Sequence, residues 1–125
     1  MKNSAFSLLE LLIVIAIIGV LASITYPAYT KHIAHVNQHR ATLLLLEIAN
    51  QLEEQHSILG TYKNVSLETL LIQPNPPLPY QFELSTVSDN NFTLKAIPND
   101  IQQSLNTCGI LWLNSTETTS VSCQR

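Results

Sequence analysis

Histidine, cysteine and one isolated carboxylate are the residues through which this 125-residue chain could do chemistry. Three of its four histidines, His32, His35 and His39, recur at helical spacing, and imidazole is a common metal ligand. No acid or cysteine stands at ligand spacing beside them, so we expect a solvated or headgroup-facing stripe and no metal site. No Ser/His/Asp order or phosphate-binding glycine loop is evident either, so the sequence predicts neither an enzyme nor a cofactor.

The two cysteines, Cys108 and Cys123, both stand near the C-terminus. Beside an N-terminus that looks exported, they indicate one disulfide formed in an oxidising compartment. The alternative is a pair of unpaired buried thiols. A bridge between them would close the last hairpin and stabilise a small domain by about 3 kcal/mol.

Composition limits the classes of protein to consider. The chain is 46% hydrophobic and 12% charged, with a formal net charge of −3, and much of its apolar weight lies in the first 24 residues. A free-standing nucleic-acid binder usually carries a basic excess, which this chain lacks. The remainder after the apolar start has the composition of one small polar domain.

The apolar start has three interpretations. Every residue from Leu11 to Ala22 is apolar or glycine, and the stretch 6–24 as a helix of about 28 Å just crosses a bilayer core of about 30 Å. A secretory signal cut near Ser23 and a plain signal-anchor both fit this length. Neither accounts for Glu10, because a charge deep in lipid costs on the order of 3 kcal/mol.

The third interpretation accounts for Glu10. The run Ala5-Phe6-Ser7-Leu8-Leu9-Glu10-Leu11 resembles the type IV prepilin signature. The resemblance implies that prepilin peptidase removes the leader 1–5 and N-methylates Phe6. It also implies that Glu10 pairs with the new terminal ammonium of a neighbouring subunit and so sets the register of assembly. The family nearly always has glycine before the cut, where this chain has Ala5.

The chain after the leader predicts one long, interrupted helix. Residues 6–27 form the transmembrane and assembly segment, which Gly19 and Pro27 weaken into a kink or break. A simple bend where the helix leaves the membrane is an equal alternative. Residues 28–60 form an amphipathic helix that ends at Gly60 in a left-handed cap. Its apolar face comprises Ile33, Val36, Leu43, Leu44, Ile48 and Leu52.

The rest of the chain predicts a small antiparallel sheet. Residues 61–79 form a connecting loop with a short turn after Ser66, and residues 80–125 form the head. Strands are predicted at 80–85, 92–97, 110–114 and near 118–122 from alternating patterns and turn residues. Strand alternation turns Ile110 and Trp112 outward as a contact surface, unless the opposite pair is exposed or a loop covers Trp112.

The expected fold is therefore α+β, a long N-terminal helix packed on a small antiparallel sheet, as in pilins. The C-terminal run from Thr107 to Asn114, followed by Cys123, resembles a minor-pilin group that includes the competence pilin. This resemblance implies a non-enzymatic structural subunit of a type IV pilus. Its partners would be other pilin subunits, prepilin peptidase and the inner-membrane assembly machinery. It would lie in the inner membrane with its head in the periplasm, and then in the extracellular pilus.

Two alternatives share the N-terminal signature. A competence pilin would capture DNA, and its head offers Lys63, Lys95 and Arg125 as phosphate contacts, which are few. DNA is therefore a less favoured partner than other subunits. A pseudopilin of a type II secretion system is the second alternative. The cysteine pair favours the pilus, as does the lack of an acid-dense loop that could hold calcium near the C-terminus.

Overall fold

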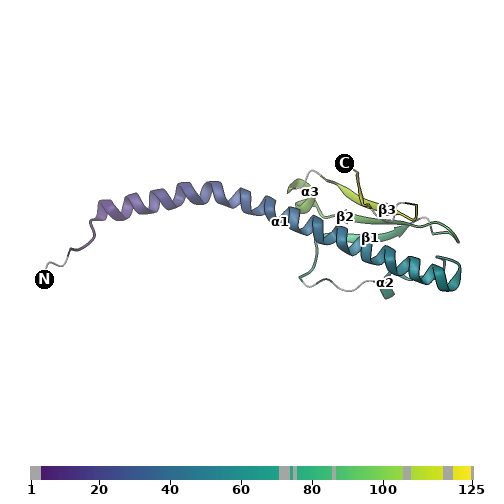
Figure 1. The fold of residues 1–125 in the computed structure, drawn as a ribbon. Helices are drawn as coiled ribbons and strands as arrows, with labels where there is room; N and C mark the ends of the chain where they lie inside the picture. The colour runs from purple at the N-terminus through teal and green to yellow at the C-terminus, as the bar shows by residue number, and fades with distance from the viewer. Residues whose placement is uncertain are drawn as a thin grey trace. The chain divides into compact units, whose positions relative to one another are not determined.

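The computed structural model describes residues 4–70, 74, 76–85, 87–105, 108–116 and 120–124. They divide into two compact units, Met1–Ile33 and Ala34–Arg125. Helix α1 belongs to both, and the remaining elements belong to the second unit (Figure 1). The elements are α1 (Leu8–Leu59), α2 (Leu67–Leu70), β1 (Tyr80–Ser85), β2 (Thr93–Pro98), α3 (Asp100–Leu105), β3 (Ile110–Asn114) and β4 (Ser122–Gln124). The long helix and the small sheet confirm the predicted α+β pilin fold.

The sheet is a four-stranded antiparallel meander in the order β1-β2-β3-β4. Strands β1 and β3 have the predicted bounds, and β2 begins and ends one residue later than predicted. The fourth strand was predicted too early. It occupies Ser122–Gln124 because pairing places Leu111 opposite Cys123, whereas 117–119 lie outside the described residues.

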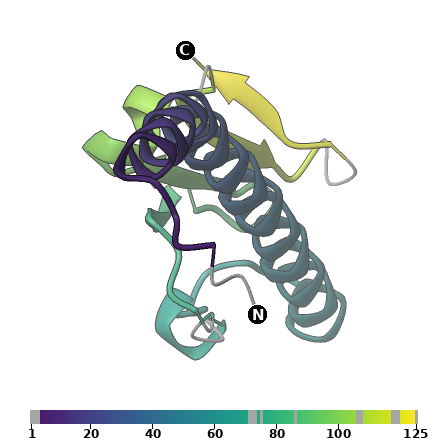
Figure 2. The ribbon, with the colours of Figure 1, turned by 90° about the vertical axis from the view of Figure 1, so that its left-hand side faces the viewer.

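The core of the second unit lies between α1 and one face of the sheet (Figures 1 and 2). Its side chains come from every second residue of the strands, such as Leu94, Leu111 and Leu113. The helical contribution is Ala41, Leu44, Leu45, Ile48, Ala49 and Leu52, all buried. Because successive side chains of a strand point to opposite faces, the alternate apolar residues all lie on the face of the sheet that covers the core.

The predicted apolar face of the helix was partly wrong. Leu44, Ile48 and Leu52 are buried as expected, but Ile33, Val36 and Leu43 are exposed. The buried positions outside the predicted face are Leu45 and three alanines, Ala34, Ala41 and Ala49. The methyl group of an alanine lets the helix backbone approach its neighbours closely. Exposed apolar residues therefore remain on the outer side of this helix.

Helix α3 was not predicted at all. Asn99 caps it, since the Asn99 side-chain oxygen accepts a hydrogen bond from the Gln102 amide at 2.9 Å. Gln102 is buried, and its side-chain nitrogen donates to the carbonyl of Ala34 at 2.7 Å and to the Tyr80 hydroxyl at 3.2 Å. The Gln102 side-chain amide therefore links α3 to β1, through Tyr80, and to α1, through Ala34.

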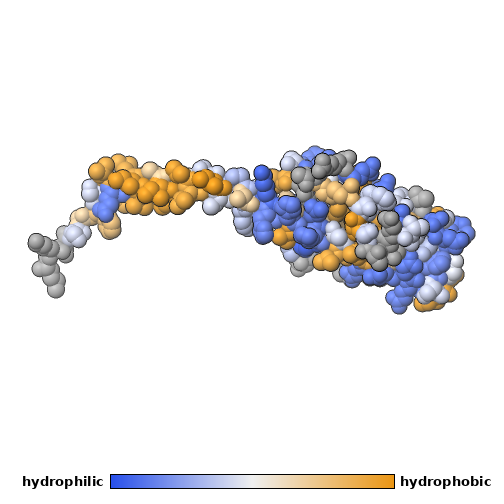
Figure 3. All heavy atoms as spheres, turned by 45° about the horizontal axis from the view of Figure 1, so that its top comes forward, coloured by the Kyte–Doolittle hydropathy of each residue, from blue (hydrophilic) through white to orange (hydrophobic). Residues whose placement is uncertain are grey.

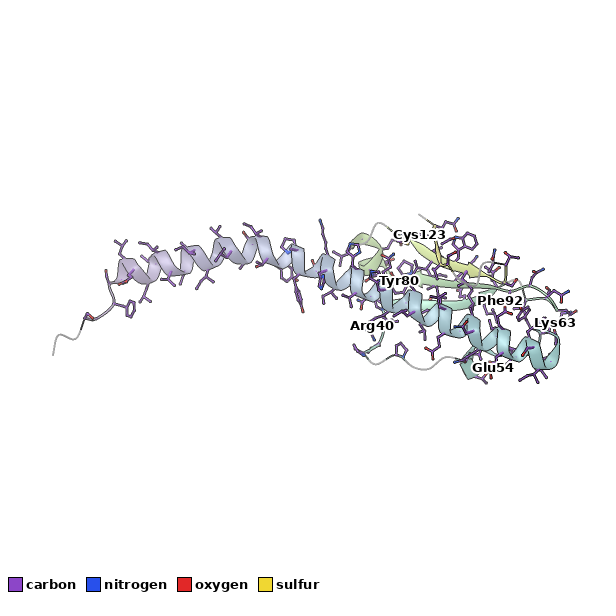
Figure 4. All side chains as sticks on the ribbon, viewed as in Figure 1. Arg40, Glu54, Lys63, Tyr80, Phe92 and Cys123 are labelled. Atoms are coloured by element: carbon purple, nitrogen blue, oxygen red, sulfur yellow. A yellow bond between two sulfur atoms is a disulfide. The ribbon has the colours of Figure 1, made fainter. Side chains whose placement is uncertain are left out.

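The predicted end of the long helix is confirmed. Gly60 has a φ of 72°, the left-handed conformation, and its amide donates to the His56 carbonyl at 2.8 Å. The turn predicted after Ser66 is α2, where the amide and the hydroxyl of Thr69 both donate to the Ser66 carbonyl. Arg40 donates to the Pro76 carbonyl at 2.7 Å and so attaches the connecting segment to α1 (Figure 4).

Cys108 and Cys123 form the predicted disulfide, with their Cα atoms 5.7 Å apart (Figure 4). Cys108 is buried at the edge of the core, while Cys123 is exposed on β4. The alternative of two unpaired thiols is therefore excluded. The bridge ties the C-terminal strand to the residue that precedes β3.

Candidate functional site

The N-terminal segment brings Ala5, Phe6 and Glu10 together around the start of α1. Ala5 and Phe6 precede the helix and are exposed, with Phe6 75% exposed. The Ser7 carbonyl accepts hydrogen bonds from the amides of Glu10, at 3.0 Å, and Leu11, at 3.2 Å. Glu10 therefore stands in the first turn, where the helix dipole favours a negative charge.

A local signal for this helix start was missed in the sequence. Ser7 and Glu10 have the spacing S-x-x-E of a capping box, in which a serine precedes the helix and an acid follows three residues later. Glu10 thus has a local reason to stand in the first turn. This reason does not compete with pairing between subunits, because a carboxylate can accept several hydrogen bonds.

The apolar stretch after Glu10 is exposed along its whole length. Large side chains from Leu11 to Ile24 have about half or more of their surface accessible, and Figure 3 shows them gathered as a continuous apolar surface. Among the described residues, α1 is the one helix long and apolar enough to cross a membrane. A shallow apolar hollow on this stretch is lined by Ile13, Ala16, Ile17, Val20 and Leu21.

The helix is not interrupted at Gly19 and Pro27, because α1 is continuous through both residues, and a kink or bend there stays a prediction. Pro27 offers no amide to the carbonyl of Ser23. Hydroxyl groups nearby donate to carbonyls of the preceding turn: Ser23 to Val20 at 2.7 Å, Thr25 to Leu21 at 2.8 Å and Thr30 to Pro27 at 3.0 Å. Side chains therefore supplement the backbone bonds around the proline, although such bonds also favour bending.

The sheet brings together two residues that the sequence singled out for separate reasons. In the β2–β3 register, Lys95 lies directly opposite Trp112, and in the β1–β2 register it lies opposite Glu83. Lys95 and Trp112 alternate with buried neighbours, and exposed Glu83 alternates with half-buried ones, so all three occupy the face of the sheet turned away from the core. We call the row of Glu83, Lys95, Trp112 and Ser122 the outer row.

Strand β3 has the orientation that was predicted. Leu111 and Leu113 are buried, while Ile110 and Trp112 are half-buried on the opposite face. Trp112 is therefore accessible in part, and it is the chain's only tryptophan. Directly opposite positions in an antiparallel pair place side chains within contact distance, which makes Lys95 and Trp112 one surface.

The predicted basic set does not form one patch among the described residues. Lys63 donates to a carboxylate oxygen of Asp89 at 3.0 Å and so has its own counter-ion. Lys95 instead has Glu83 and Trp112 as cross-strand neighbours. Arg125 lies outside the described residues. Of the three cations, Lys95 is thus the one that the described structure leaves beside an aromatic surface.

Asp89 and Tyr62 hold the β1–β2 loop and the end of α1 together. Asp89 accepts hydrogen bonds from Lys63 and from Thr61, at 2.8 Å, and these bonds hold the pKa of its carboxyl below the ordinary range. Tyr62 donates to Glu53 at 2.9 Å, and burial together with this carboxylate raises the pKa of Tyr62 to about 12. The loop before β2 is therefore fixed by charge-assisted bonds.

The histidines do not assemble a metal site in the described part of the chain. His32, His35 and His39 are exposed, and the described residues contain no group of three or more side chains suited to a metal ion. His56 has a structural role that the sequence did not reveal. Its ring stacks on Tyr62 with centroids 4.2 Å apart, and its Nε2 lies 3.1 Å from the Asp89 carbonyl oxygen.

A long apolar-started helix, a small antiparallel head and a C-terminal disulfide together define a pilin. The family described as type IV minor pilin ComP, DNA uptake sequence receptor, matches residues 27–112. The prokaryotic N-terminal methylation motif matches residues 1–26. The chain therefore belongs to this family of type IV minor pilins, whose members are structural subunits of pili.

Two individual proteins resemble the chain. The fimbrial protein EcpB of Eikenella corrodens is 51% identical over 39 residues, which is 31% of this chain. That match spans about a quarter, 24%, of the length of EcpB. The crystal structure of the non-core minor pilin PilV of Neisseria meningitidis superposes with a TM-score of 0.59 and 28% identity, covering 76% of this chain and 92% of that one.

Proposed function

We propose that the chain is a minor pilin that enters the membrane through α1 and is then built into a type IV pilus. The observation that carries this proposal is the exposed apolar stretch of α1, in which Glu10 is the one acidic or basic residue between residues 8 and 30. An apolar surface of this kind is stable only in lipid or against other helices. A membrane stage followed by a filament stage supplies both environments.

The proposal assigns roles to the N-terminal residues. Prepilin peptidase cuts between Ala5 and Phe6 and methylates Phe6, and the match to the methylation motif supports this. Glu10 of one subunit pairs with the terminal ammonium of its neighbour, so that two costly charges compensate each other. The head lies in the periplasm until the inner-membrane machinery assembles the subunit, and it performs no catalysis.

Intact mass and N-terminal sequencing of the native protein test this proposal. A chain that begins at methylated Phe6 supports it, whereas a chain that begins near Ser23 overturns it, because the apolar stretch would then be a discarded signal. Ala5→Gly provides a matched control for processing. Glu10→Gln should leave cleavage intact and reduce recovery of the subunit in sheared pili, while Glu47→Gln, which lies exposed on α1 outside the apolar stretch, should not.

We also propose that the head contacts DNA, as a second function. The match to a family described as a DNA uptake sequence receptor favours it, and that match includes both Lys95 and Trp112. The outer row offers a cation for phosphate next to an aromatic face on which a base or sugar can pack. The few basic side chains in the sequence made DNA a less favoured partner than other subunits. The family match favours DNA as a partner more strongly.

The charge of one head remains small, so binding by a single subunit is expected to be weak. Lys63 is neutralised by Asp89, and Lys95 faces Glu83 on its other side. Few phosphate contacts per subunit give a shallow salt dependence. Repetition of the subunit, or neighbouring subunits of other kinds, would add contacts and raise the overall affinity.

Fluorescence of the single tryptophan provides a direct test with short duplex DNA. We expect DNA to change the Trp112 emission, and Lys95→Gln to weaken binding and lower the salt slope by about one phosphate. Binding by the Trp112 variants, which lack the tryptophan signal, is measured with fluorescently labelled DNA. Trp112→Phe should weaken binding less than Trp112→Ala, because Phe keeps an aromatic face. Lys63→Gln is the matched control. Equal affinities for the wild type and Lys95→Gln would remove Lys95 from the DNA site.

A further inference from the structure

Four side chains immediately after the apolar stretch of α1 form an unusual group. Tyr26, Tyr29, Lys31 and His32 are all exposed, and the two tyrosines are 72% and 65% exposed. We call residues 26–32 the aromatic–basic segment. The segment lies in the first unit of the chain, directly after the apolar stretch that ends at Ile24, and it contains no acidic residue.

The charge of this segment is not compensated along the helix. From Leu11 to Leu46 the sequence contains no aspartate or glutamate, so the acids that flank Lys31 are Glu10 and Glu47. The single ion pair found among the described residues joins Lys63 to Asp89, far from this segment in sequence. Lys31 therefore presents its positive charge to whatever surrounds α1 at this level.

The depth of the segment fits the polar layer of a membrane. If Ile24 marks the end of the hydrocarbon-spanning stretch, Tyr26 lies about 3 Å and Lys31 about 10 Å further along the helix. The headgroup layer on each side of a bilayer is several ångströms thick. Tyrosine is enriched at this depth, and lysine can lay its stem on apolar surface while its ammonium reaches the headgroups.

We propose that the aromatic–basic segment binds anionic phospholipid headgroups while α1 spans the membrane. Lys31 supplies the attraction for the lipid phosphate, and the ring hydroxyls of Tyr26 and Tyr29 hold the helix at headgroup depth. The argument is charge complementarity together with direct continuity with the apolar stretch. The proposal rests on the membrane stage proposed above, and it is independent of DNA binding.

Lipid selectivity of the reconstituted full chain tests this proposal. The chain is placed in phosphatidylcholine bilayers with trace spin-labelled phosphatidylglycerol or phosphatidylcholine, and the motionally restricted fraction of each label is measured by electron spin resonance. We expect the restricted fraction to favour phosphatidylglycerol by roughly two- to five-fold. Lys31→Gln should bring the ratio close to one, and Lys63→Gln, in the head and paired with Asp89, should leave it unchanged.

The possible outcomes separate this proposal from the ones before it. Equal restriction of both lipids by the wild type overturns the proposal while leaving the membrane stage intact. Selectivity that survives in Lys31→Gln also overturns it, because the attraction would then lie elsewhere. A chain that restricts neither lipid does not span the bilayer, and both proposals fail. Loss of selectivity in inorganic phosphate at constant ionic strength would identify a free-phosphate site and overturn the lipid assignment.

Discussion

Lys95 and Trp112 lie directly opposite each other on β2 and β3, with Glu83 facing Lys95 from β1. The cation thus stands between an aromatic ring and a carboxylate. Opposite charges across a strand pair attract, and on an exposed face this attraction is worth at most about 1 kcal/mol. Glu83 therefore reduces the positive potential that Lys95 offers to an anionic partner.

Replacement of Glu83 should strengthen any binding of the head to DNA. We expect Glu83→Gln to raise the affinity about two-fold at low salt, because one repulsive carboxylate beside Lys95 is removed. Fluorescence titration of Trp112 with duplex DNA measures this change. Glu54→Gln, exposed on α1, removes the same charge elsewhere and should change the affinity less. An equal gain in both variants would indicate a general charge effect.

The buried amide of Gln102 should be important for the stability of the head. Gln102→Ala removes bonds to the Ala34 carbonyl and the Tyr80 hydroxyl and leaves a small cavity, so we expect a loss of about 1–3 kcal/mol. Chemical denaturation of the full chain in detergent measures this loss. Gln103→Ala on the exposed side of the same helix should cost far less. Similar costs in the two variants would contradict the role of Gln102.

Acid should loosen the attachment of the β1–β2 loop. Bonds from Lys63 and Thr61 lower the pKa of Asp89 in the folded chain, so their stabilisation is present above about pH 4 and is lost as the pH falls below that range. We expect Asp89→Asn to flatten the fall in melting temperature between pH 4 and lower pH at low salt. High salt should weaken the effect, since the pair is exposed. An unchanged acid profile in Asp89→Asn would rule out this contribution.

Alkali should act on Tyr62 in the opposite sense. Burial and the Glu53 carboxylate raise the pKa of Tyr62 to about 12, so the neutral phenol stabilises the fold below about pH 10 and this contribution is lost as the pH rises toward 12. Tyr62→Phe keeps the ring but loses the bond to Glu53, and we expect a cost of about 1 kcal/mol at neutral pH. Ultraviolet titration should show one fewer late-titrating phenol. Tyr29→Phe, whose hydroxyl is exposed, is the control and should leave the Tyr62 titration unchanged.

The sequence predicted the parts of the fold that local pattern determines. Alternating residues located β1 and β3 to the residue, Gly60 marked the end of α1, and the N-terminal motif located the apolar stretch. The disulfide could be predicted because the chain has two cysteines, and an oxidising compartment favours a bond between them. The strands, the helix end and the apolar stretch depend on residues close in sequence, and the disulfide depends on there being one possible cysteine pair.

The sequence failed where tertiary contacts decide. The helix face was misassigned because large apolar residues were counted, whereas alanines such as Ala41 and Ala49 form much of the contact with the sheet. Helix α3 is too short to show a period, although Asn99 and Pro98 before it were available as signals. Strand register is set by the whole sheet, so nothing local could place Lys95 opposite Trp112.

The disulfide has a further consequence for survival of the subunit. Cys108 and Cys123 are 15 positions apart, and β3 lies between them. A protease that cuts one peptide bond within this interval leaves the two fragments covalently joined through the disulfide. A nicked head would therefore retain its C-terminal piece, and only reduction of the disulfide would release it.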